Sequence, residues 1–137
     1  MRLAFILFDQ MTSLDLIGFY DPVTRLQSMG FMPELQYHFC ARSEEIRDDR
    51  GLVYRVDQGN NDLSGYDMLF VPGGMGTRSL MHDEAFIDWL KTAQPVPYKV
   101  SVCTGSLLLG AAGRIPRFAR SANGELHGTI FYYKWLE

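Results

Sequence analysis

Residues 98–113, "YKVSVCTGSLLLGAAG", place a cysteine directly between a strand pattern and a helix pattern. Val100 and Val102 alternate with polar neighbours, which is typical of a short β-strand. After Cys103 the sequence is rich in glycine, leucine and alanine, and this composition predicts a buried helix that stops near Gly113. Because almost no loop separates the two patterns, we predict that Cys103 lies at a sharp strand-to-helix turn, at the carboxyl end of the strand.

The rest of the chain alternates strand patterns with helix patterns. Apolar runs and apolar spacing predict strands at 3–8, 35–40 and 66–71, a hairpin or a short excursion over 46–56, and helices over 16–29 and 83–94. Pro22 lies inside the first helix pattern, where it is expected either to kink the helix or to begin its regular part with Asp21 as the cap. Such alternation predicts an α/β fold with a mostly parallel sheet covered by helices on both faces.

Length and composition limit the classes of protein that need to be considered. The 137 residues suit a single domain, residues 1–137, and 21% charged residues are ordinary for a globular chain. A net charge of −3 provides no basic surface for nucleic acid, and no apolar run approaches the about 20 residues of a membrane span. The amino terminus lacks a signal-peptide cleavage site, so we expect a cytoplasmic protein with Cys40 and Cys103 as reduced thiols.

Two glycines and a threonine are predicted to lie near Cys103, because ligand sites in parallel sheets form at the carboxyl ends of strands. Gly73 and Gly74 follow the strand at 66–71, and Thr104 follows the cysteine. A cysteine at a helix amino terminus has its thiolate favoured by the helix dipole, and the N–H groups of Gly74 and Thr104 could hold developing negative charge. This arrangement matches a nucleophile elbow. The alternative is a small buried cysteine at a tight corner.

Asp15 lies in the apolar stretch "SLDLIG", residues 13–18, which is an unusual setting for a carboxylate. Close to a thiolate it would stay protonated, because burial and a nearby like charge both raise the pKa of a carboxyl group. The alternative is an acidic residue in the first turn of a helix, forming a capping box with Thr12. No spacing of His, Cys and Asp indicates a metal site, and no cofactor is expected.

Three motifs together carry a resemblance to a known family: "SLDLIG", "VPGGMGTRSL" at residues 71–80, and "SVCTGSLLLGAAG" at 101–113. In this order and spacing they resemble the ThiJ/PfpI superfamily of class I glutamine amidotransferase-like domains, and within it the isocyanide hydratase branch. The similarity covers residues 1 to about 113. It implies a flavodoxin-like αβα sandwich that forms a homodimer, with Cys103 as the nucleophile and Asp15 as its acidic partner. Thr104 matches the residue that this branch has after the cysteine.

The resemblance implies an enzyme that hydrates a small-molecule isocyanide to an N-substituted formamide. Cys103 would form a thioimidate, Asp15 would act as acid and base, and Gly73, Gly74 and Thr104 would surround the substrate. Three alternatives remain: glyoxalase or deglycase chemistry at the same thiol, a non-catalytic ligand-sensing domain or fragment of a transcriptional regulator, and an inert remnant. No nucleic acid or membrane partner is expected.

The sequence departs from the family pattern at two places. Gly18-Phe19 stands where the family has Gly-Pro, which predicts a different position for the helix that carries Asp15. After Gly113 the usual continuation is replaced by an unrelated tail that contains His127. We therefore expect a truncated or frame-shifted product or a pseudo-enzyme, marginally stable, with exposed sheet edges that residues 129–136 cover in part.

Overall fold

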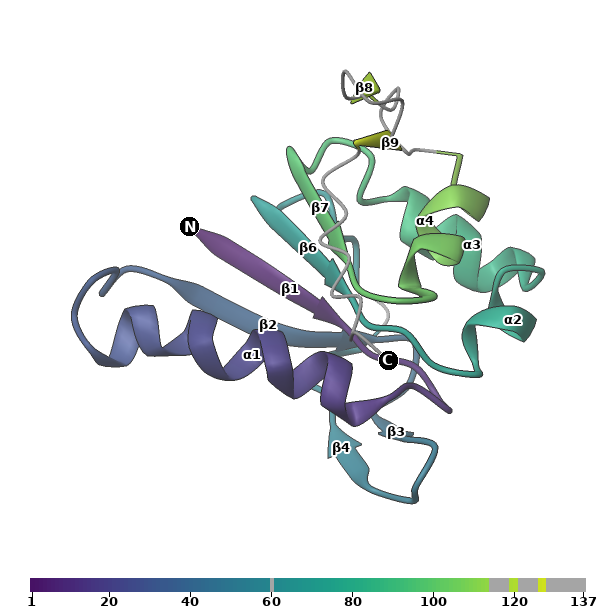
Figure 1. Cartoon of the computed structure of the whole chain (residues 1–137), viewed down its shortest axis with the longest axis horizontal. Helices are drawn as coiled ribbons and strands as arrows, with labels where there is room; N and C mark the ends of the chain where they lie inside the picture. The colour runs from purple at the N-terminus through teal and green to yellow at the C-terminus, as the bar shows by residue number, and fades with distance from the viewer. Residues whose placement is uncertain (60, 114–118, 121–125, 128–137) are drawn as a thin grey trace.

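A five-stranded parallel sheet forms the centre of the computed structural model (Figure 1). The structure describes residues 1–59, 61–113, 119–120 and 126–127. In spatial order the strands are β5 (Gln58–Gly59), β2 (Gln36–Ala41), β1 (Arg2–Ile6), β6 (Met68–Val71) and β7 (Tyr98–Ser101). Every neighbouring pair in this sheet is parallel. The predicted α/β class and parallel sheet are confirmed, and of the five strands in this sheet β5 alone was not expected.

Helices cover both faces of the sheet, as predicted. Phe70 of β6 stacks on Phe19 of α1 (Ser13–Ser28), with ring centroids 4.3 Å apart. The preceding residue, Leu69, points to the opposite face, where Leu90 and Leu109 line a small gap with it. Those two leucines belong to α3 (Glu84–Lys91) and α4 (Gly105–Ala111), which lie together with the short α2 (Thr77–Leu80) away from α1 (Figure 1).

The face under α1 is built mainly from aromatic rings. Phe5 of β1 is fully buried and contacts the rings of Phe19, Tyr20, Tyr37, Phe39 and Phe70 at centroid distances of 5.4 to 6.4 Å. Tilted and edge-on pairs at such distances are favourable beyond the area that they bury. This packing fixes α1 against β1 and β6, and so fixes the position of its amino end, which carries Asp15.

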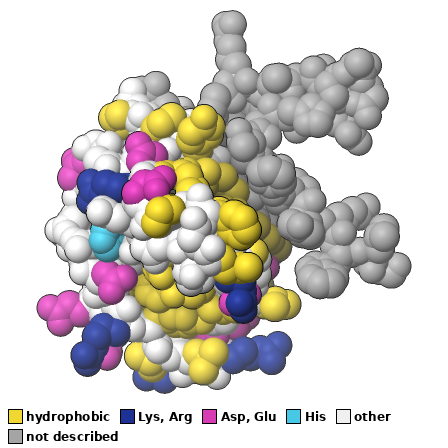
Figure 2. All heavy atoms as spheres, turned by 90° about the vertical axis from the view of Figure 1, so that its left-hand side faces the viewer, with side chains coloured by type: hydrophobic (Ala, Val, Ile, Leu, Met, Phe, Trp, Pro, Cys, Tyr) yellow, Lys and Arg dark blue, Asp and Glu magenta, His cyan; other side chains and the backbone are white. Residues whose placement is uncertain are grey.

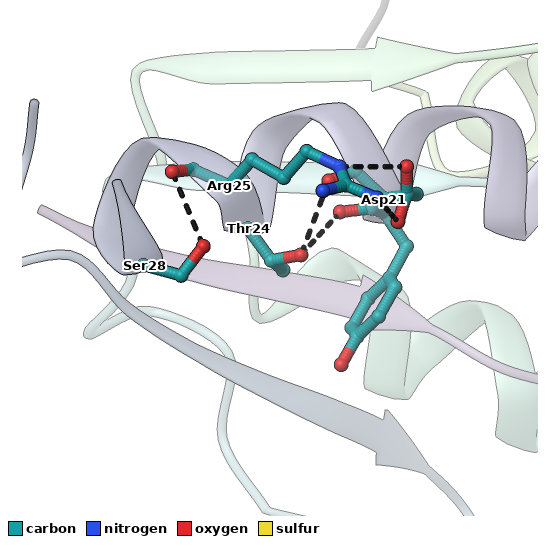
Figure 3. Close-up of polar contacts among 5 residues, drawn as sticks. Asp21, Thr24, Arg25 and Ser28 are labelled. Carbon is teal, nitrogen blue, oxygen red and sulfur yellow. Dashed lines mark hydrogen bonds and ion pairs between the residues drawn. The ribbon is translucent and has the colours of Figure 1, made fainter. Parts of the chain in front are cut away.

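Pro22 does not begin the helix, and Asp21 is not its cap: α1 runs through Pro22 from Ser13 to Ser28. Side chains supply hydrogen bonds in the turns around the proline (Figure 3). Thr24 Oγ1 donates to the carbonyl of Tyr20 at 2.8 Å, and Asp21 pairs with Arg25 at 3.0 Å. Packing of the aromatic face keeps the helix continuous at a residue that has no N–H to donate.

The remaining predicted elements are close to their expected positions. The hairpin consists of antiparallel β3 (Glu45–Arg47) and β4 (Val53–Arg55). Asp83 caps α3 by accepting a hydrogen bond from the amide of Phe86 at 3.0 Å, and Gly113, with φ +71°, follows the end of α4. A further antiparallel pair joins β8 (Ala119–Arg120) to β9 (Leu126–His127). The predicted role of residues 129–136 lies outside the described residues.

Hydrophobic side chains gather in a band across the side of the molecule that faces left in Figure 1 (Figure 2). The connection between α1 and β2, at that side in Figure 1, carries Met29 and Phe31, which are 64% and 73% exposed.

In the part of the chain that the structure describes, no helix is long and apolar enough to cross a bilayer.

Candidate active site

Cys103 occupies the turn between β7 and α4, as the sequence predicts. Its φ is +51°, a left-handed conformation that non-glycine residues seldom adopt and that costs backbone energy. The residue is exposed, whereas Cys40 is buried in β2. The turn therefore holds a strained residue with its thiol accessible from solvent, at the carboxyl end of the parallel sheet.

Gly105 allows the start of α4 to approach the end of β6 closely. A methyl group at this position would collide with the carbonyl oxygen of Val71 and would lie 2.6 Å from that of Pro72. No side chain fits into such a space, so glycine is required here. The tight contact brings the turn that contains Cys103 next to the Pro72-Gly73-Gly74 segment.

Asp15 reaches across from the first turn of α1 to the same segment. Its Oδ2 accepts a hydrogen bond from the amide of Gly73 at 3.0 Å. Burial raises the pKa of the Asp15 carboxyl, the charge of Asp49 raises it further, and the Gly73 hydrogen bond opposes them. The capping-box interpretation is wrong, because Thr12 makes no side-chain cap and the Asp15 carboxyl is bonded to Gly73 instead.

Gly73 is the point at which the acid and the thiol-bearing residue meet. A methyl group on its α-carbon would lie 2.7 Å from Asp15 Oδ2, 2.8 Å from Cys103 Cβ and 3.0 Å from the Thr104 nitrogen. All three groups thus surround one small volume beside a backbone that has no side chain. The sequence predicts these four residues as neighbours, and the structure brings them together.

Gly74 and Thr104 are bonded to each other. The amide of Gly74 donates to Thr104 Oγ1 at 3.0 Å, and that hydroxyl donates to the Gly74 carbonyl at 3.2 Å. The Gly74 amide, which is predicted to stabilise developing negative charge, is therefore hydrogen-bonded to the threonine hydroxyl in this structure. Its role toward a substrate stays a prediction.

The segment after β1 also lies at the carboxyl end of a strand, where ligand sites are expected in a parallel sheet, and it packs against the site. Gln10 has a left-handed φ of +63°, and its carbonyl accepts a hydrogen bond from the amide of Gly76 at 3.2 Å. A methyl group on Gly74 would lie 2.7 Å from the α-carbon of Met11, so this segment packs directly on the glycines. The glycines of "PGGMG" allow this close approach, because they carry no side chain.

A cleft of about 400 Å³ opens beside the site, at the carboxyl ends of β1 and β2. Phe8, Leu80 and Phe86 give it an apolar wall, while Asp9 and Arg42 are among its polar residues. Cys103 does not line this cleft. Among the described ranges, no three His, Cys, Asp or Glu side chains group closely enough to hold a metal ion.

Fold and site together define an α/β protein with a cysteine at a strand-to-helix turn and a carboxyl group close to it. The sequence pattern of the DJ-1/PfpI family matches residues 1–123. The chain belongs to the DJ-1/PfpI family. It is 36% identical over 132 residues to isonitrile hydratase from Pseudomonas putida, an alignment that covers 95% of this chain and 55% of that protein. The chain thus spans about half the length of this relative.

Solved structures agree with the family's fold. Toxoplasma gondii DJ-1 in its oxidized form superposes with a TM-score of 0.64 and 17% identity, covering 82% of this chain and 61% of that one. A DJ-1 superfamily protein from Salmonella typhimurium superposes with a TM-score of 0.66 and 17% identity, covering 85% of this chain and 63% of that one. An AraC family transcriptional regulator from Pseudomonas putida superposes with a TM-score of 0.64 and 18% identity, again covering 85% of this chain and 63% of that one. At these identities the likeness concerns the fold alone.

The two thiols should differ in reactivity toward iodoacetamide at neutral pH. We expect Cys103 to be alkylated first, because it is exposed. Cys40 is 1% exposed, and burial raises the pKa of its thiol to about 11, so little thiolate forms there. Peptide mapping after timed labelling measures both rates, and labelling of Cys40 before Cys103 would contradict the placement of the two residues.

Substitution of Gly73 by alanine should destabilise the protein by about 1–3 kcal/mol, because the new methyl group is forced against Asp15 and Cys103. Gly18→Ala is the matched control: Gly18 lies inside α1, and apart from its chain neighbours and the adjacent helix backbone no atom lies within 4 Å of the new methyl group. The change should stabilise the protein by up to about 1 kcal/mol. Urea unfolding of both variants measures the difference. A Gly73→Ala protein as stable as the parent would show that the space beside Gly73 is not closed.

Proposed function

We propose that this chain carries the catalytic centre of an isocyanide hydratase, an enzyme that adds water to R–N≡C to give the formamide R–NH–CHO. The observation that carries the proposal is the meeting of Asp15 and Cys103 at Gly73. The 36% identity to a hydratase supports the choice of substrate class. That relative is nearly twice as long, so the proposal concerns the part that the two chains share.

In the first step, the Cys103 thiolate adds to the terminal carbon of the isocyanide, and Asp15 delivers its proton to that carbon. The product is a thioimidate, R–N=CH–S–Cys103, and Asp15 is left as a carboxylate. The raised pKa of Asp15 supports this role, because a carboxyl group kept protonated at higher pH is an available donor.

In the second step, the Asp15 carboxylate takes a proton from water as the hydroxyl adds to the thioimidate carbon, and passes that proton to nitrogen. The tetrahedral adduct then collapses: its hydroxyl proton returns to Asp15, the C–S bond breaks, and the formamide leaves. Both residues regain their starting protonation states, so the cycle consumes only isocyanide and water.

Two other functions would use the same geometry. An α-oxoaldehyde could be attacked by the same thiol, and a sensing domain of a regulator would bind a ligand without turnover. The likeness to a solved AraC family regulator concerns the fold and does not distinguish these functions. The carboxyl group beside the thiol favours an enzyme, because turnover needs a group that transfers protons there and ligand binding alone does not. Parallel assays with an alkyl isocyanide and an α-oxoaldehyde distinguish the three.

Asp15→Asn should reduce the kcat for a small alkyl isocyanide by about 10²–10⁴-fold and leave alkylation of Cys103 unchanged, because the amide cannot donate the proton. Formation of formamide, followed by mass spectrometry, measures turnover. Activity should fall as the pH rises through the raised pKa of Asp15.

Asp49→Asn is the matched control for this prediction. It removes a charge that raises the pKa of Asp15, and it should retain turnover while moving the fall in activity to lower pH. Full activity of Asp15→Asn would remove Asp15 from the mechanism.

We also propose that the protein forms a homodimer through a surface beside the site. Leu14 and Ile17 on the outer side of α1 are 66% and 42% exposed, and Leu52 and Val53 on the neighbouring hairpin are 58% and 50% exposed. Hydrogen bonds join these two segments, so the four apolar side chains belong to one region.

Leu14→Glu should therefore shift the chain from dimer to monomer in sedimentation equilibrium. Phe31→Glu is the control: Phe31 is more exposed but lies beyond the other end of α1, and its substitution should leave the dimer intact. A monomeric parent protein, or dissociation by Phe31→Glu alone, would contradict the proposed surface.

A further inference from the structure

A buried carboxylate lies between β3 and β4, outside the residues assigned to the reaction. Asp48 is only 1% exposed. Its Oδ1 accepts hydrogen bonds from the amides of Arg50 and Leu52 at 2.9 and 2.8 Å, and its Oδ2 accepts one from Ser13 Oγ. A charge taken out of water in this way is tolerated because each of its oxygens has donors. Two of the donors belong to the turn itself, and the third comes from α1.

Ser13 is the first residue of α1 and lies two positions before Asp15. Its hydroxyl donates to Asp48 and accepts a hydrogen bond from the Tyr54 hydroxyl at 2.7 Å. Thr12, at the N-cap position, provides no side-chain cap. The carboxylate of Asp48 therefore lies, from a distant part of the chain, at the amino end of α1, where a negative group is favourable.

Backbone hydrogen bonds reinforce the contact between the hairpin and the start of α1. The amide of Asp49 donates to the carbonyl of Met11 at 3.1 Å, and the amide of Gln10 donates to the carbonyl of Arg47 at 2.9 Å. The hairpin thus holds residues 10–13 from one side.

On the other side, the same segment is held by Gly73. The amide of Thr12 donates to the Gly73 carbonyl at 2.9 Å, and the amide of Gly73 donates to Asp15 Oδ2 at 3.0 Å. The first turn of α1 is therefore fixed between the hairpin and the Gly73 backbone. Release of either side would change how the Asp15 carboxyl sits beside Cys103.

We propose that Asp48 is a positioning residue: by accepting the Ser13 hydrogen bond it fixes the first turn of α1 and keeps the Asp15 carboxyl against Gly73, beside Cys103. The catalytic importance of this contact rests on the proposed role of Asp15 as the acid. The placement of Asp15 by Asp48 is independent of that catalytic role and can be measured without substrate.

The two aspartates are suited to different tasks. The Ser13 hydrogen bond and the turn amides lower the pKa of Asp48, so it stays ionised and accepts hydrogen bonds. Burial and the neighbouring charge of Asp49 raise the pKa of Asp15, so it keeps its proton to higher pH. Over the interval between their pKa values, an ionised Asp48 can hold a protonated Asp15 in place.

Ser13→Ala and Asp48→Asn test the proposal from both ends of the hydrogen bond. Ser13→Ala leaves the Asp48 turn intact, and Asp48→Asn keeps a side-chain oxygen for the turn amides. Asp62→Asn is the matched control, because Asp62 also accepts a hydrogen bond from a backbone amide two residues on, that of Ser64 at 2.7 Å, in the segment that precedes β6.

The first measurement is the pH titration of the Gly73 amide resonance by NMR, because this N–H donates to Asp15 and senses its ionisation. In both test variants we expect the titration midpoint to move toward the ordinary aspartate value, and in Asp62→Asn we expect the parent midpoint. An unchanged midpoint in both test variants would overturn the proposal.

The second measurement is hydratase kinetics with a small alkyl isocyanide. We expect both test variants to lower kcat by about ten- to a hundredfold with little change in KM, as misplacement of a catalytic group does. A moved midpoint with unchanged kcat would refute the catalytic part of the proposal. If the parent protein has no hydratase activity, the proposed function fails, and the Gly73 titration still decides whether Asp48 positions Asp15.

Discussion

The arrangement of the site depends on the absence of a side chain at Gly73. Its bare α-carbon lets the Asp15 carboxyl and the Cys103 β-carbon approach the same small volume, and its amide holds the carboxyl by a hydrogen bond. Parallel pairing of β6 with β1 on one side and with β7 on the other brings the three strand ends together. The aromatic packing of α1 and the close contact at Gly105 then set the distances. The geometry of this site is thus first a matter of how closely the backbones can approach.

Local patterns were sufficient to predict most of the sheet and its helices. Apolar runs predict β1, β2 and β6, and the abrupt change at Cys103 predicts the turn, because each signal lies within a few adjacent residues. Pro22 shows where local rules end. Its chemistry suggests a kink or a helix start, but the contact of Phe19 with Phe70, 51 positions further along the chain, holds a continuous helix through it. The short α2 and β5 carry too few residues to give a periodic signal.

The polar contacts of the site could be predicted only in part. The apolar setting of Asp15 is visible in the sequence, but its partner is an amide 58 positions away, and the local pattern suggests a capping box with Thr12 that does not form. Asp48 gave no signal beyond that of an ordinary turn residue, because its burial results from the packing of the hairpin on α1. Such tertiary contacts decide that the pKa of Asp15 is raised and that of Asp48 is lowered.

The separations along the chain have a consequence for folding. Ser13 and Asp48 are 35 positions apart, Asp15 and Gly73 are 58 apart, and Gly74 and Thr104 are 30 apart. Contacts of this kind form slowly, since long loops must close before any of them is gained. A nascent or partly folded chain therefore carries an ordinary thiol with no acid beside it. The acid and the thiol come together only when these long-range contacts have formed, so their joint reactivity would report on the folded state of the chain.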